Sequence, residues 1–214
     1  MENIKIILAS ASPRRTELLR TAGIPHTVMA TNADEVPQGV PSQGIQGITF
    51  AEWYASEASR LKADAACNML RREEGRIIVI SADTVVSPDG NRIFGKPRDT
   101  IDAREMLLTL SGTEHSVVGG VTITDLLDGN TVDRVTAACT SRVWMARLTE
   151  RQIDTYIDTG EPFGKAGAYA IQGLASQLIE SVNGDYANVV GISVALVARL
   201  LRERFSIDTT EFWK

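Results

Sequence analysis

The stretch IILASASPRR, residues 6 to 15, runs from an apolar segment into serines, a proline and two adjacent arginines. Its apolar part belongs to a predicted buried strand over residues 4 to 9. Ser12 is a residue type favoured at the N-cap, and Pro13 suits the first helical position, so a helix is expected to begin here and to stop at Gly23. The strand therefore leads directly to a helix N-terminus that carries two guanidinium groups.

The rest of the chain alternates helical and strand patterns, which is typical of an α/β fold. Residues 32 to 49, with several prolines, glycines and glutamines, predict a loop. Two long β-runs flank a turn at residues 128 to 130 and so predict a hairpin. The spacing TERQ at residues 149 to 152 predicts a capping box at the start of a helix. The other expected strands cover residues 25–31, 76–86, 115–127, 131–145, 169–173 and 177–182, and the other expected helices cover residues 50–72, 100–111, 149–159 and 188–205.

Composition limits the partners that the chain can have. Its 214 residues, of which 43% are hydrophobic and 23% charged, suffice for one globular unit with a real core. A formal net charge of -5 argues against nucleic acid or an anionic membrane as the main partner, because both require a net basic surface. The two cysteines are isolated, no stretch is long enough to span a membrane, and the first residues do not form a signal peptide. We therefore expect a soluble cytoplasmic protein.

The predicted helix start is the first candidate site. The dipole and the free backbone N–H groups of a helix N-terminus attract anions. Arg14 and Arg15 add two groups that can bind phosphate bidentately. Ordinary solvated arginines are the alternative, but their charge is unfavourable at the positive end of a helix. The pattern therefore indicates a phosphate or polyphosphate site.

The stretch GNRIFGKP, residues 90 to 97, nearly matches the phosphate-binding pattern G-x-x-x-x-G-K-[ST]. Pro97 has neither a hydroxyl for magnesium nor a backbone N–H, so we exclude a P-loop. Lys96 remains a candidate cation, because Gly95 and Pro97 restrict the backbone around it. A surface lysine in a turn is the alternative interpretation.

Asp83 is the sharpest acidic candidate. It follows a strongly apolar run, where an unpaired carboxylate is costly. Such a group binds a metal, pairs with a cation or accepts a proton in catalysis, and a structural pair with an arginine is the alternative. Asp34 and Glu35 offer oxygen ligands of the kind that magnesium or manganese prefers, although such a pair is also common in a solvated loop. The wide separation of His26 and His115 argues against a zinc site.

Seven segments follow one another over nearly the whole chain: LASASPRRTELL at 8–19, DE at 34–35, the lysine of RLKA at 60–63, SADTVV at 81–86, GKPRD at 95–99, GEPFGKAGAYAIQG at 160–173 and GDYANVVG at 184–191. Together they resemble the Maf family of nucleoside triphosphate pyrophosphatases. The resemblance implies a single Maf-like domain over residues 1–214. Its fold would be the two-lobed α/β fold shared with inosine triphosphatases, in which an elongated mixed sheet carries a nucleotide cleft between the lobes.

The same resemblance implies an enzyme. The expected reaction is hydrolysis of a nucleoside triphosphate between its α and β phosphorus atoms, to the monophosphate and pyrophosphate, with Mg, Mn or Co as the divalent cation. The resemblance also implies a homodimer and a role in nucleotide-pool sanitation or cell-division arrest. The implied site residues are Asp83 as proton acceptor with Lys62 and Lys96 as catalytic cations, Ser10, Arg14 and Arg15 for the phosphates, and Glu35 and Asp83 for the metal.

Three positions bear on the substrate. Arg14, Thr84 and Gln172 match the branch of the family that resembles dTTP and UTP pyrophosphatases, so we expect dTTP and UTP, and modified pyrimidine nucleotides, as substrates. The Gln172 amide can pair with the O4/N3 edge of thymine or uracil. The branch acting on 7-methyl-GTP often has glutamine after the catalytic aspartate, and a 7-methyl-GTP pyrophosphatase remains the alternative. A septum-formation regulator that binds nucleotides with little turnover is another, but the presence of Asp83 favours an enzyme.

Overall fold

The computed structural model describes residues 4–31, 36–38 and 47–213. The strands are β1 (Lys5–Ala9), β2 (Thr27–Val28), β3 (Arg76–Ser87), β4 (Glu114–Leu127), β5 (Asn130–Met145) and β6 (Ile179–Asn183). The α-helices are α1 (Pro13–Thr21), α2 (Phe50–Met69), α3 (Thr100–Leu110), α4 (Glu150–Asp158), α5 (Tyr186–Val190) and α6 (Val194–Phe205). The short 3-10 helices are Ala166–Ala168, Leu174–Leu178 and Thr209–Trp213. None of these helices is both long and apolar enough to cross a membrane.

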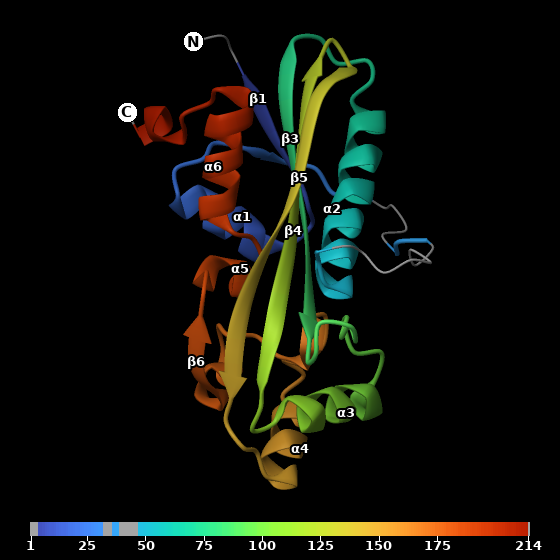
Figure 1. Ribbon diagram of the computed structural model, residues 1–214, viewed down its shortest axis with the longest axis vertical. Helices are drawn as coiled ribbons and strands as arrows, with labels where there is room; N and C mark the ends of the chain where they lie inside the picture. Colours follow the sequence, from blue (N-terminus) through green and yellow to red (C-terminus); the bar gives the residue numbers. More distant parts are fainter. Residues whose placement is uncertain (1–3, 32–35, 39–46, 214) are drawn as a thin grey trace.

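All six strands form one mixed sheet in the order β2-β1-β3-β4-β5-β6. Strand β1 runs parallel to β2 and β3, whereas the pairs β3–β4, β4–β5 and β5–β6 are antiparallel. Figure 1 shows the long strands β3, β4 and β5 running along most of the elongated molecule. The mixed α/β class with an elongated sheet, predicted from the sequence, is confirmed.

Two main cores lie at opposite ends of the long strands, and we call the two halves the first and second lobes. In the first lobe, α1 and α6 pack on the sheet around residues such as Leu19, Ile80 and Leu201. In the second lobe, α3 and α4 pack around Leu107 and Ile153. Because β3, β4 and β5 pass through both cores, the sheet joins the lobes and places residues of both around the same central region.

Helix α2 packs unusually close to the sheet. A Cβ atom added to Gly120 of β4 would lie 2.1 Å from the Ala55 carbonyl oxygen of α2. The alanines Ala55, Ala58 and Ala63 of this helix are fully or almost fully buried. Small side chains on the helix and a missing one on the strand thus allow the close approach that brings α2 to the middle of the sheet.

Several local predictions are confirmed. Strand β1 and the β4–β5 hairpin lie where the patterns placed them. Helix α4 begins with the predicted capping box, in which the Thr149 hydroxyl accepts from the Gln152 N–H and the Gln152 side chain accepts from the Thr149 N–H. Helix α1 begins at Pro13 with Ser12 at the N-cap, as predicted, although the Ser12 side chain makes no capping bond. Instead, the Ser12 N–H donates to the Ser10 hydroxyl.

Other boundaries differ from the predicted ones. The predicted strand at residues 169–173 is wrong, because this segment belongs to an irregular loop. The predicted helix from Asn188 is also wrong: α5 begins earlier, capped by the Asp185 carboxylate, and α6 is a separate helix capped by Ser193. The two helices are separate because α5 ends at Val190, with Gly191 as its C-cap, and the chain turns there. Strand β2 is only two residues long, and α2 ends at Met69 rather than near residue 72.

Candidate active site

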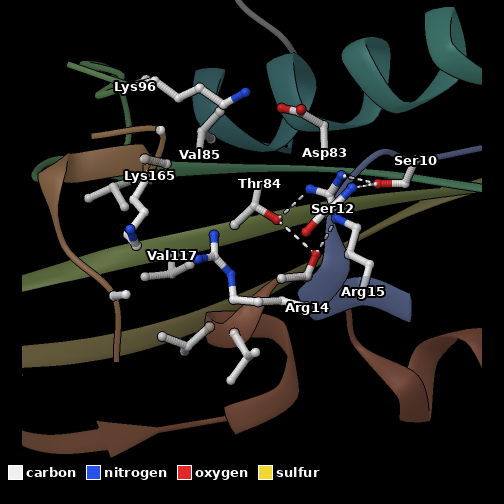
Figure 2. Close-up of a pocket in the computed structure, with 18 of the residues that line it drawn as sticks. Ser10, Ser12, Arg14, Arg15, Asp83, Thr84, Val85, Lys96, Val117 and Lys165 are labelled. Carbon is white, nitrogen blue, oxygen red and sulfur yellow. Dashed lines mark hydrogen bonds between the residues drawn. The ribbon is translucent and has the colours of Figure 1, made fainter. Parts of the chain in front are cut away.

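A cleft of about 980 Å³ lies on the middle of the sheet (Figure 2). Its walls come from the β1–α1 connection, α2, the middle of β3, the turn at residues 95–96 and the loop at residues 164–172. Segments that are far apart in the sequence therefore meet in one cavity. Of the residues predicted from the sequence, the cleft brings together Ser10, Arg14, Arg15, Lys62, Asp83, Thr84, Lys96 and Gln172. Glu35 lies outside the described residues, as does Asp34.

The acidic group of the cleft is Asp83. Among the described residues that line the cleft, it is the one carboxylate. Its Oδ1 lies 2.7 Å from Nζ of Lys62, and the side chains are 17% and 8% exposed respectively. The Lys62 ammonium also donates to the Ala82 carbonyl at 3.4 Å. The cation beside Asp83 is thus a lysine of α2. It is not an arginine, which the sequence had left open as a structural partner.

Arg15 is a buried residue that ties together three parts of the site. Its Nε donates to the Gly191 carbonyl at 2.8 Å, Nη1 to the Ser10 hydroxyl at 3.3 Å and Nη2 to the Thr84 hydroxyl at 3.2 Å. The Thr84 hydroxyl in turn donates to the same Gly191 carbonyl at 3.0 Å. Figure 2 shows this network beside Asp83. The guanidinium therefore fixes the relative positions of β1, β3 and the end of α5.

Arg14 differs from its neighbour. Its side chain is half-buried and lines the cleft, and within the described part of the chain it makes no hydrogen bond or ion pair. Lys96, which is exposed at the cleft edge, likewise has no such bond to a described residue. Figure 2 shows both side chains extending into the space that the cleft leaves open. Arg14 and Lys96 are therefore available to bind an anion, whereas the Arg15 guanidinium is already hydrogen-bonded to residues of the cleft wall.

Sequence reasoning missed three residues that line the cleft. Lys165 lies on the wall opposite Asp83 in Figure 2, and its ammonium donates to the carbonyls of Glu161 and Phe163. The motif KAGAY was visible in the sequence and was the signal that could have found it. Phe50 and Tyr54 at the start of α2 add aromatic surface to the cleft. Burial and the charge of Asp83 both raise the pKa of Tyr54, so its hydroxyl stays neutral.

The chain resembles a known family along almost its entire length. A family model described as Maf-like protein matches residues 5–204. The chain belongs to the Maf family.

Curated Maf relatives cover the same span. A protein of Alkaliphilus metalliredigens named dTTP/UTP pyrophosphatase is 37% identical over 95% of this chain and 98% of its own. Proteins with the same name from Caldanaerobacter subterraneus subsp. tengcongensis and Geotalea uraniireducens are 40% and 42% identical, each over 95% of this chain and over 91% and 96% of their own. Among solved structures, the Staphylococcus aureus Ham1 protein is 14% identical with a TM-score of 0.36, covering 66% of this chain and 72% of that one. That last likeness is too weak to bear on the site.

The donor set of this Maf cleft fits a cation that arrives with a phosphate ligand. No group of three or more His, Cys, Asp or Glu side chains suitable for a metal occurs within residues 4–31, 36–38 and 47–213. Magnesium is commonly held by one or two carboxylates together with substrate phosphates rather than by a full protein cage. Asp83 supplies one such carboxylate beside a cationic wall. The described residues therefore fit a metal–triphosphate complex better than a metal bound alone.

Proposed function

We propose that this Maf protein is a pyrophosphatase that hydrolyses dTTP and UTP, and modified pyrimidine triphosphates, to the monophosphate and pyrophosphate. The observation that carries the proposal is the pairing of one carboxylate, Asp83, with an otherwise cationic cleft. A nucleotide-binding regulator has no need of a buried carboxylate at its phosphate site. The names of the curated relatives support the same reaction and the same substrates.

In this proposal, Asp83 is the proton acceptor. Water adds to the α phosphorus, the bond from that phosphorus to the α–β bridging oxygen breaks, and its electron pair leaves with the pyrophosphate product. The proton of the attacking water passes to the Asp83 carboxylate. The Lys62 ammonium, 2.7 Å from Oδ1, orients the carboxylate so that the other oxygen can face the water.

The cations of the cleft stabilise the charge that grows on the departing pyrophosphate. Arg14 and Lys96 bind the phosphates directly, because neither has a hydrogen-bonding partner within the described residues. Ser10 and Arg15 shape the phosphate site, since both line the cleft and the Arg15 guanidinium donates to the Ser10 hydroxyl. A divalent cation, Mg²⁺, Mn²⁺ or Co²⁺, would neutralise part of the triphosphate charge, with Asp83 and Glu35 as its proposed protein ligands.

Base recognition is assigned to Gln172. The Gln172 amide lines the cleft and can both donate to O4 and accept from N3–H of thymine or uracil. Thr84 and Arg14 complete the specificity set inferred from the family. Cytosine presents an amino group at position 4 and an unprotonated N3, so an amide held in the orientation that fits uracil discriminates against it. The homodimer, the cytoplasmic location and the single domain over residues 1–214 remain predictions from the sequence.

A steady-state panel tests the function directly. Purified protein with Mg²⁺ is assayed on dTTP, UTP, dCTP, dGTP and 7-methyl-GTP, and the released pyrophosphate and monophosphate are identified. We expect dTTP and UTP to be hydrolysed with the highest kcat/KM and to yield pyrophosphate. A panel led by 7-methyl-GTP, a product mixture with orthophosphate, or triphosphate binding without turnover would each refute the proposal.

A further inference from the structure

A carboxylate outside the cleft closes the loop that forms one of its walls. Glu161 immediately precedes this segment, residues 162–173, which we call the cleft loop. Its Oε2 accepts from the Leu174 N–H at 3.0 Å, and its Oε1 accepts from the Ala175 N–H at 3.1 Å. The same Oε1 accepts from the Tyr156 hydroxyl at 3.0 Å. The Glu161 side chain therefore joins the residues that follow the cleft loop to the residue that precedes it and to helix α4.

The cleft loop carries seven of the residues that line the cleft, and Lys165 and Gln172 are among them. The Lys165 ammonium donates to the Glu161 backbone carbonyl, so Lys165 is tied to the same residue as the segment that follows the loop. In the middle of the loop, the Gly167 N–H donates to the Gly95 carbonyl at 3.0 Å. The loop thus also contacts the turn that precedes Lys96. A shift of the loop would displace several groups that face the substrate.

The fit around the carboxylate is close. A Cβ atom added to Gly173 would lie 2.7 Å from Glu161 Oε2, and Gly173 has φ +120°, a conformation that favours glycine. Glycine at the end of the IQG motif therefore makes room for the carboxylate. The residue next to Gln172 is placed directly against Glu161.

The ionisation states of Glu161 and Tyr156 agree with this arrangement. Burial acts to raise the pKa of Glu161, but the hydrogen bonds from Leu174, Ala175 and Tyr156 outweigh it, so the pKa is lowered and the carboxylate is charged. Burial and the neighbouring Glu161 charge raise the pKa of Tyr156, so its hydroxyl keeps its proton and donates. An ionised acceptor with three donors makes stronger hydrogen bonds than a neutral one.

We propose that Glu161 is a positioning residue for base discrimination: its carboxylate clasps the cleft loop and thereby sets the place of Gln172. Glu161 does not line the cleft, so it acts through the loop and not on the substrate. This inference rests on the proposed hydrolysis of pyrimidine triphosphates. It adds to the specificity set a residue to which the sequence patterns assigned no role.

The decisive measurement is the ratio of kcat/KM for UTP to that for CTP, since uracil and cytosine differ only at the edge that Gln172 is proposed to contact. Glu161→Gln keeps the size of the side chain but leaves one acceptor oxygen where the carboxylate has two. We expect the ratio to fall about tenfold, on the scale of one hydrogen bond. General destabilisation of the fold would lower both rates and leave their ratio unchanged. A ratio equal to that of the wild type overturns the proposal.

A double-mutant cycle then tests the route of the effect. If Glu161 acts through Gln172, the ratio in Gln172→Ala should not change further when Glu161→Gln is added. Independent, multiplying effects on the ratio would show that the clasp does not act through Gln172. Glu105→Gln on the exposed side of α3 is the matched control and should leave the ratio unchanged, because no described residue hydrogen-bonds to this side chain.

A second variant covers the case in which Glu161→Gln fails to fold. Tyr156→Phe removes one of the three donors and leaves the Glu161 carboxylate itself in place, and it should lower the ratio in the same direction by a smaller factor. Amide hydrogen exchange on the intact protein gives a readout that needs no turnover: residues 162–175 should exchange faster in either variant. Should the wild type fail to hydrolyse dTTP, the proposed function falls, whereas unchanged exchange in this segment refutes the clasp itself.

Discussion

Lys62 and Asp83 form an ion pair of 2.7 Å in which both side chains are largely removed from water, although they come from different elements, α2 and β3. Taking two charges out of water is costly, and the pair is kept only where its geometry compensates. Asp83 is the one carboxylate among the described cleft residues. Since the Lys62 ammonium is paired with it, this lysine orients the carboxylate. The arrangement leads to the first prediction.

Asp83→Asn should remove most of the turnover and leave the fold intact. The amide cannot accept the proton of the attacking water, so kcat should fall by about a hundredfold or more. Its oxygen can still accept a hydrogen bond from Lys62, and circular dichroism should therefore show native secondary structure. Asp154→Asn, at an exposed ion pair with Arg104, is the control and should keep its activity. A near-normal rate for Asp83→Asn would exclude the proton-acceptor role.

The adjacent arginines should behave differently when each is changed to lysine. Arg15→Lys loses the fork that reaches Gly191, Ser10 and Thr84, so we expect a loss of about 1–3 kcal/mol in the free energy of unfolding. Arg14→Lys should keep its stability within about 0.5 kcal/mol and instead raise KM for the triphosphate. Urea denaturation and steady-state kinetics separate the two effects.

Arg20→Lys is the control for that pair. It lies on the same helix in an exposed ion pair with Glu17 and should change neither stability nor KM. An Arg14→Lys variant as unstable as Arg15→Lys would contradict the distinction between a binding and a structural arginine.

His115 should make the stability depend on pH. Its ring is buried and shares a hydrogen bond of 2.7 Å with the Tyr169 hydroxyl. Burial lowers its pKa from 6.5 to about 4, so protonation favours the unfolded chain, in which the pKa is ordinary. The stability is therefore complete above about pH 6.5 and is lost as the pH falls toward 4.

Between pH 7.5 and 5, this group should remove about 2 kcal/mol from the free energy of unfolding. His115→Gln should reduce the acid-induced loss by that amount, measured by urea denaturation at both values. His26→Gln, the other histidine, is the control and should retain the loss. The same pH dependence in His115→Gln would show that another group causes it.

Gly120→Ala should destabilise the protein. The added methyl group would lie 2.1 Å from the Ala55 carbonyl, which is helix backbone and cannot turn away. Overpacking of this kind costs about 1–3 kcal/mol. It should also displace α2, which carries Lys62, and so lower kcat. Gly95→Ala, where the new Cβ meets no atom within 4 Å, is the stability control, and equal melting temperatures for the two variants would argue against the close approach.

Predictions governed by near neighbours in the chain were the reliable ones. The TERQ capping box joins Thr149 to Gln152, three residues away, and the turn between β4 and β5 is equally local. The predicted strand at residues 169–173 failed because distant groups decide its course. Tyr169 bonds to His115, 54 positions earlier, and the segment beyond it is fastened by Glu161. An alternating pattern alone cannot distinguish this loop from a strand.

The candidate site shows the same division. By itself, the sequence determined the residue types that the chemistry needs, namely the arginines at the start of a helix, Asp83 at the centre of an apolar strand and Gln172 in its motif, because these follow from local pattern and family resemblance. Only the tertiary structure decided that Lys62 is the partner of Asp83, that Arg15 is buried while Arg14 faces the cleft, and that a glutamate outside the cleft closes the loop. The physical reason is that hydrogen bonds and ion pairs depend on distances in space, and here those distances are set by a long sheet that brings remote parts of the chain together.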